Sequence, residues 1–112
     1  MYIRTENDKV KKIADHYGIE KQLHQLAEEC SELAVEASHS ARKGVTVKII
    51  EEMADVLLMI EQVVYLSGIA IDDIDECIRF KIDRQMKRIR EEESDVLRKT
   101  KELIRQECIL LS

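Results

Sequence analysis

The chain has 112 residues, the size of one domain whose core a second subunit can complete. Charged residues make up 37% and apolar residues 45%, with three glycines and no proline, which is typical of an all-α protein. The formal net charge of -5 argues against general nucleic-acid affinity. The first ten residues contain no apolar signal region, and no apolar run reaches the roughly 20 residues of a membrane span. We therefore expect a single cytoplasmic all-α domain over residues 1–112, without nucleic-acid or membrane partners.

The three cysteines, Cys30, Cys77 and Cys108, show no metal-ligand spacing. A free cysteine behaves as a small hydrophobic residue, and a reducing cytosol keeps thiols free. We therefore expect all three to be reduced and buried.

The first two helices are expected on either side of Gly18. Thr5 can cap a first helix that runs to about Tyr17, and the glycine ends it. A second helix is predicted from Ile19 to about Arg42, because apolar residues recur at helical spacing. They form one continuous stripe: Leu23, Leu26, Ala27, Cys30, Leu33, Ala34, Ala37 and Ala41.

A third helix is predicted between Thr46, a suitable N-cap, and Gly68. Its segment 49–66 is apolar on nearly every side, which predicts the central rod of a bundle. The turn after Gly44 is short, so this helix and the second one should lie antiparallel. Asp55 would then be a carboxylate inside the rod, which is costly unless it is paired or binds a metal.

A fourth helix should begin at Asp72 or Asp73, with its core side formed by Ile71, Ile74, Ile78, Ile82, Met86 and Ile89. Beyond it, Ser94 can cap a separate last helix, although one continuous long helix is nearly as well supported. The expected fold is an antiparallel four-helix-type bundle over about residues 19–90. We expect the tail, 91–112, to be a helical extension, and oligomerisation to complete the burial of the apolar residues.

Two pairs of acidic residues share helical faces. Glu29 and Glu32 lie on one face of the second helix, and Glu52 and Asp55 on one face of the third. Packed side by side, these helices bring four like charges together, which a divalent cation would neutralise. Ligation by oxygen alone favours Mg²⁺, or Mn²⁺, over zinc. The alternative is a solvated acidic face, because such spacing is common by chance in an acidic chain.

Further charged residues fit a phosphate substrate. Glu28 lies one turn before Glu32 and is a candidate for a further metal ligand or for the base that activates water; the alternative is an exposed helix residue. Lys81, Arg84 and Arg88 recur at helical spacing and can hold phosphate oxygens. The equally well supported alternative is that these basic residues form a solvated face and pair with nearby acidic side chains.

The segments EECSEL, 28–33, and EEMADVL, 51–57, resemble the MazG-like branch of the all-α nucleoside triphosphate pyrophosphohydrolases. The resemblance covers about residues 23–88. The family pattern, E-x-x-E followed by E-x-x-D, is matched here by Glu29, Glu32, Glu52 and Asp55.

The resemblance implies a helical bundle that binds Mg²⁺ through those four carboxylates and hydrolyses a nucleoside triphosphate to the monophosphate and pyrophosphate. It also implies a homodimer or homotetramer, with Lys81 and Arg84 matching the family's basic residues. In such a site we expect Glu28 to assist the attacking water and Gln22 or Gln25 to face the nucleoside. The tail after residue 90 has no counterpart in the family, and the chain has no tryptophan or aromatic box for a base.

Two other functions remain open at this point. One is a phosphoribosyl-ATP pyrophosphohydrolase, which shares the architecture. The other is a non-catalytic helical module, whose acidic groove receives a basic partner and whose tail makes a coiled-coil contact.

Overall fold

The computed structural model describes residues 7–111, which form four α-helices. The prediction of an all-α protein is confirmed. The chain divides into two units, Met1–Asp73 and Ile74–Ser112, which are described separately below.

Helix α1 spans Asp8–Tyr17 and contributes the buried side chains of Val10 and Ala14. Asn7 caps it: the Oδ1 atom of this residue accepts hydrogen bonds from the backbone N–H groups of Lys9, at 2.9 Å, and Val10, at 3.4 Å. Two backbone donors at the helix start are thereby satisfied. The predicted cap, Thr5, lies outside the described residues.

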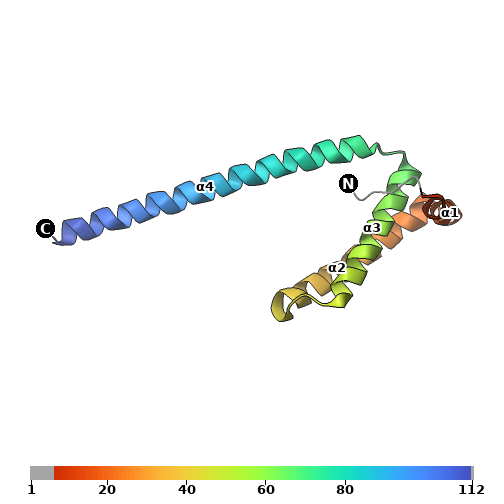
Figure 1. Cartoon of the computed structure of the whole chain (residues 1–112), viewed down its shortest axis with the longest axis horizontal. Coiled ribbons are helices and arrows are strands. Elements are labelled where there is room, and N and C mark those ends of the chain that lie inside the picture. The colour runs from red at the N-terminus through yellow and green to blue at the C-terminus, as the bar shows by residue number, and fades with distance from the viewer. Residues whose placement is uncertain (1–6, 112) are drawn as a thin grey trace. The chain divides into compact units, whose positions relative to one another are not determined.

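Helices α2, Ile19–Lys43, and α3, Val47–Ser67, form a helical hairpin whose arms lie side by side (Figure 1). The N–H of Gly44 bonds to the carbonyl of Ser40 at 2.8 Å and closes the first arm at a φ of 97°. A positive φ favours glycine, so this residue suits the sharp change of direction. The predicted bounds of both helices agree with the observed bounds to within one or two residues.

The face that α2 turns toward α3 is polar, which overturns the expectation that its apolar stripe forms the core. Within α2 the buried residues are Gln22, Glu36 and Ser40. Of the apolar stripe, Leu26 and Leu33 are half-buried, and the other residues are exposed: Leu23, Ala27, Cys30, Ala34, Ala37 and Ala41. An amphipathic pattern predicts that a face will be covered but does not identify the covering element.

Helix α3 is also less enclosed than its composition suggests. Val56, Met59 and Val64 are buried, and the helix contacts both α1 and α2. Leu57 and Leu58, however, are 42% and 40% exposed within the single chain. The expectation of a rod covered on all sides is therefore wrong for one copy of the chain.

Two further expectations about side chains are wrong. Asp55 is exposed, not held inside the rod. Cys30, Cys77 and Cys108 are free, as predicted, but all three are exposed.

Helix α4 is one unbroken helix, Ile71–Leu111, and Ser94 does not begin a new one (Figure 1). The charged run 91–95 continues the helix because glutamate is a good helix former. No residue of α4 is buried.

Candidate functional site

Three carboxylates converge between the two arms of the hairpin. Glu29 comes from α2, and Glu52 and Asp55 come from adjacent turns of α3. One oxygen of each lies within 4.8 Å of the other two. The three-residue spacing on α3 places both of its carboxylates on the same side of the helix. From the sequence, these three residues were predicted to lie together with Glu32, which is described below.

Two oxygens of this cluster are buried without a hydrogen-bond partner. Glu29 accepts a bond from the Nε2 atom of Gln25 at 2.9 Å through its Oε1 atom, but its Oε2 atom is buried and unpaired among the described residues. The Oε2 atom of Glu52 is in the same condition. A buried carboxylate oxygen without a donor is costly. Carboxylate oxygens are hard donors, so Glu29, Glu52 and Asp55 are the residues that could hold a divalent cation.

Glu32, the fourth predicted ligand, lies beside this cluster but outside the three-oxygen group. Its side chain is exposed. The negative charge of Glu29 raises the pKa of Glu32 above its usual 4.5, and partial desolvation, Glu52 and Glu28 raise it further. Protonation of Glu32 would also allow its carboxyl group to donate a hydrogen bond to Glu52, which raises the pKa in the same direction. Glu32 and its three acidic neighbours, Glu28, Glu29 and Glu52, therefore interact electrostatically as one group.

The candidate water-activating residue, Glu28, is exposed on α2. It acts on the cluster through its charge, which contributes to the raised pKa of Glu32. Its position beside the carboxylates leaves it accessible to a water molecule from solvent.

The two glutamines predicted to face a nucleoside have different environments. Gln22 is 4% exposed, and its Nε2 atom donates a hydrogen bond to the Oε1 atom of Gln62 on α3. Gln25 is half-buried and bonded to Glu29. Gln22 thus holds the two arms together, whereas Gln25 orients a carboxylate of the cluster.

Lys81, Arg84 and Arg88 lie on α4, in the second unit, and all three are exposed. Their helical spacing is confirmed by the continuous helix.

Sequence reasoning assigned no role to several polar residues that α2 and α3 bury. Gln62 is 2% exposed, and its Nε2 atom also lies 3.8 Å from the sulfur of Met59. Glu36 is buried and accepts a hydrogen bond from the hydroxyl of Thr46 at 3.3 Å. Thr46 occupies the N-cap position of α3, as predicted, but its side chain makes no capping hydrogen bond. The available signal was the seven-residue spacing of Gln22, Glu29 and Glu36, which places them on one face of α2.

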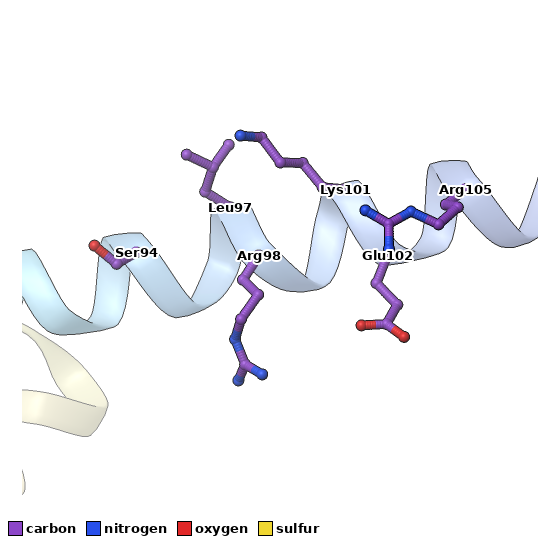
Figure 2. Close-up of a pocket in the computed structure, with 6 residues that line it drawn as sticks. All are labelled: Ser94, Leu97, Arg98, Lys101, Glu102 and Arg105. Carbon is purple, nitrogen blue, oxygen red and sulfur yellow. The ribbon is translucent and has the colours of Figure 1, made fainter.

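A shallow hollow on α4 is lined by Ser94, Leu97, Arg98, Lys101, Glu102 and Arg105 (Figure 2). All of these residues come from the same helix, so the hollow is a space between neighbouring side chains and not an enclosed site. It lacks the convergent polar groups from several elements that binding pockets use.

Comparison with known proteins identifies no relative. No family model matches the chain, and no curated protein or solved structure matches it. Within residues 7–111, none of the helices is sufficiently long and apolar to cross a bilayer.

Proposed function

We propose that the chain is a Mg²⁺-dependent hydrolase that cleaves a nucleoside triphosphate to the monophosphate and pyrophosphate. The E-x-x-E and E-x-x-D pairs support the proposal because they are the motif of the family that the sequence resembles. One structural observation carries most of the weight: two buried, unpartnered carboxylate oxygens, on Glu29 and Glu52, lie in a cluster completed by Asp55. A purely solvated acidic face would leave such oxygens in contact with water.

In this proposal Glu29, Glu52 and Asp55 hold the cation, and Glu32 adds negative charge beside them. The bound Mg²⁺ would neutralise phosphate charge and make a water more acidic. Glu28 accepts the proton of the water whose oxygen attacks the α-phosphorus. The bond between that phosphorus and the bridging oxygen to the β-phosphate breaks, and pyrophosphate leaves with the electron pair.

The remaining site residues are assigned by charge and position. Gln25, which is hydrogen-bonded to Glu29, is assigned the position beside the nucleoside. The side-chain amide of Gln22 is instead hydrogen-bonded to Gln62. Lys81, Arg84 and Arg88 supply positive charge for phosphate oxygens.

We further propose that the bundle is antiparallel and is completed in a homodimer or homotetramer. Leu23 on α2 and Met53 and Leu57 on α3 are 48%, 50% and 42% exposed in the single chain. Exposed apolar area of this kind on two adjacent helices is characteristic of an association surface.

The proposal is tested by measuring pyrophosphate release from the common and modified NTPs and dNTPs and from phosphoribosyl-ATP, with and without Mg²⁺. We expect Mg²⁺-dependent release from at least one nucleoside triphosphate. Preferential release of pyrophosphate from phosphoribosyl-ATP would instead indicate a phosphoribosyl-ATP pyrophosphohydrolase. Absence of release from the whole panel would contradict the assignment and favour a non-catalytic module.

The matched variants for this assay are Asp55→Asn and Glu51→Gln, which remove one negative charge each from α3. Loss of a direct ligand should reduce turnover by about 100-fold or more. The Asp55→Asn protein should remain folded, because removing a charge relieves repulsion within the cluster. Glu51 is exposed and outside the three-oxygen group, so its variant should retain activity. Full hydrolysis by Asp55→Asn would refute the metal site.

A further inference from the structure

The outer face of α2 carries an apolar seam that remains uncovered in the described chain. Its members recur at alternating intervals of four and three residues, and all are exposed: Leu23, Ala27, Cys30, Ala34, Ala37 and Ala41. This alternation gives two apolar residues per heptad, which is the pattern of helices that pack lengthwise against one another. Leu23 and Ala41 are 18 residues apart, which corresponds to about 27 Å of helix.

The two edges of the seam differ in polarity. One edge is apolar, because Leu26 and Leu33 lie between the seam and the contact with α3, where both are half-buried. The other edge is polar and exposed, and consists of Glu20, His24, Ser31, Ser38 and Arg42. Along it, the Nη1 atom of Arg42 donates a hydrogen bond to the hydroxyl of Ser38 at 3.4 Å. Neither Glu20 nor Arg42 forms an ion pair with another described residue.

We propose that α2 pairs with α2 of a second copy of the chain, in antiparallel orientation about a two-fold axis at position 32. Reversal about this position places every seam residue opposite another seam residue. Leu23 faces Ala41 of the second copy, Ala27 faces Ala37, and Cys30 faces Ala34. This pairing rests on the homo-oligomer proposed above, but it requires neither hydrolysis nor the cation.

The sizes of the seam residues favour the antiparallel orientation. The side chains at a contact between helices set the distance between their axes, at about 8–10 Å. In the antiparallel pair Leu23 meets an alanine at each end, so the two axes stay equally close along the whole seam. A parallel pair in register would instead stack Leu23 on its counterpart at one end and Ala41 on its counterpart at the other, which leaves gaps between the alanines.

The edges of the seam favour the same orientation. A two-fold axis perpendicular to the helices brings like edges together, so Leu33 lies near its counterpart and the polar edges meet. Glu20 then lies within two residues of the position opposite Arg42, which gives a contact of opposite charges at each end. Lys21 and Lys43 are about 160° around the helix from the seam, so their like charges stay apart. A parallel pair would place the polar edge against the leucine edge.

The contact can be tested by disulfide trapping in the full chain, with Cys77→Ser and Cys108→Ser so that Cys30 is the only native thiol. When the axes are about 8 Å apart, opposite Cα atoms lie within the roughly 4.4–6.8 Å that a disulfide requires. Ala34→Cys in this background, oxidised by copper phenanthroline in air, should give at least about 10-fold more covalent dimer than the background protein. Peptide mapping should find Cys30 of one copy linked to the introduced thiol of the other.

Val35→Cys is the matched control for this trapping. Val35 is 71% exposed and lies about 100° around the helix from Ala34, so its covalent dimer should stay at the background level. The background protein reports the orientation, because the two Cys30 residues of an antiparallel pair are offset by about 6 Å along the axis and should not bridge. A bridge between two Cys30 residues would indicate a parallel pair and overturn the proposal. Equal amounts of covalent dimer in Ala34→Cys and Val35→Cys would also overturn it.

Sedimentation analysis separates this contact from the wider proposal of a homo-oligomer. Ala34→Glu places a charge in the seam and should halve the number of subunits in the oligomer, while circular dichroism still reports a helical protein. Val35→Glu adds the same charge outside the seam and should leave the oligomer unchanged. An oligomer that survives Ala34→Glu would overturn the contact through α2 but not the proposed oligomer. A monomeric wild-type chain would overturn both, and neither result bears on pyrophosphate release.

Discussion

In the hairpin of α2 and α3, polar side chains are buried while much of the apolar surface is exposed; in α4, no residue is buried at all. Gln22, Glu36, Ser40 and Gln62 are each less than 9% exposed. Gln22 is hydrogen-bonded to Gln62, and Glu36 to Thr46, which offsets the cost of burying these polar groups at the contact between α2 and α3. The apolar residues of α4, by contrast, are exposed along the whole helix. In both regions the observed burial departs from the hydrophobic pattern, in α2 and α3 by burying polar side chains and in α4 by exposing apolar ones.

Substitution of one large apolar residue in each region gives the largest expected difference in stability. Met59 on α3 is 6% exposed, whereas Phe80 on α4 is 69% exposed. Met59→Ala leaves a cavity and should lower the free energy of unfolding by about 2–5 kcal/mol. Phe80→Ala should change it by less than about 0.5 kcal/mol. Urea unfolding of both variants checks the comparison, and equal losses would show that the two helices are equally packed.

The buried amide pair provides the next largest effect. Gln62→Leu leaves the side chain of Gln22 without its partner, which should cost about 1–3 kcal/mol of unfolding free energy. The double variant Gln22→Leu/Gln62→Leu removes both polar groups and should recover much of that loss. A double-mutant cycle by urea unfolding measures the coupling between the two residues. Additive losses would indicate that the amide–amide hydrogen bond is energetically unimportant.

The smallest effect concerns the charge of Glu32. Its pKa is raised in the folded protein, so proton binding contributes stability that is present below the usual pKa of 4.5 and is lost as pH rises through the folded-state value. Glu32→Gln should therefore raise the Tm of the Mg²⁺-free protein slightly at about pH 7.5 and have no effect at about pH 4. Thermal unfolding at the two pH values measures this difference. A lower Tm at neutral pH would mean that the ionised carboxylate is stabilising, contrary to the repulsion inferred from its neighbours.

The helix boundaries, and the shared helical face of Glu52 and Asp55, were predictable because their causes are local. Gly18, Gly44 and Gly68 follow the ends of three helices, with φ values of 83°, 97° and 73°. The three-residue spacing of Glu52 and Asp55 is sufficient to place them on one face of a helix.

The face of α2 that packs on α3 could not be predicted, because hydrophobic periodicity shows that a face is covered and not by which element. Leu23 and Cys30 belong to the apolar stripe, yet they are exposed in the single chain. Asp55 was expected to be buried for the same reason: the apolar residues around it were assumed to be covered within one copy. The continuity of α4 past Ser94 was a choice between two closely matched signals, a capping residue and a run of good helix formers.

The proposed hydrolysis depends on the binding of a divalent cation by Glu29, Glu52 and Asp55. Titration calorimetry with Mg²⁺ tests it most directly, using the wild-type chain, Glu52→Gln and the neighbouring control Glu51→Gln. We predict saturable binding by the wild type and by Glu51→Gln, and a loss of affinity of about 10-fold or more in Glu52→Gln. No saturable binding by the wild type, or equal affinity in the two variants, would contradict the claim.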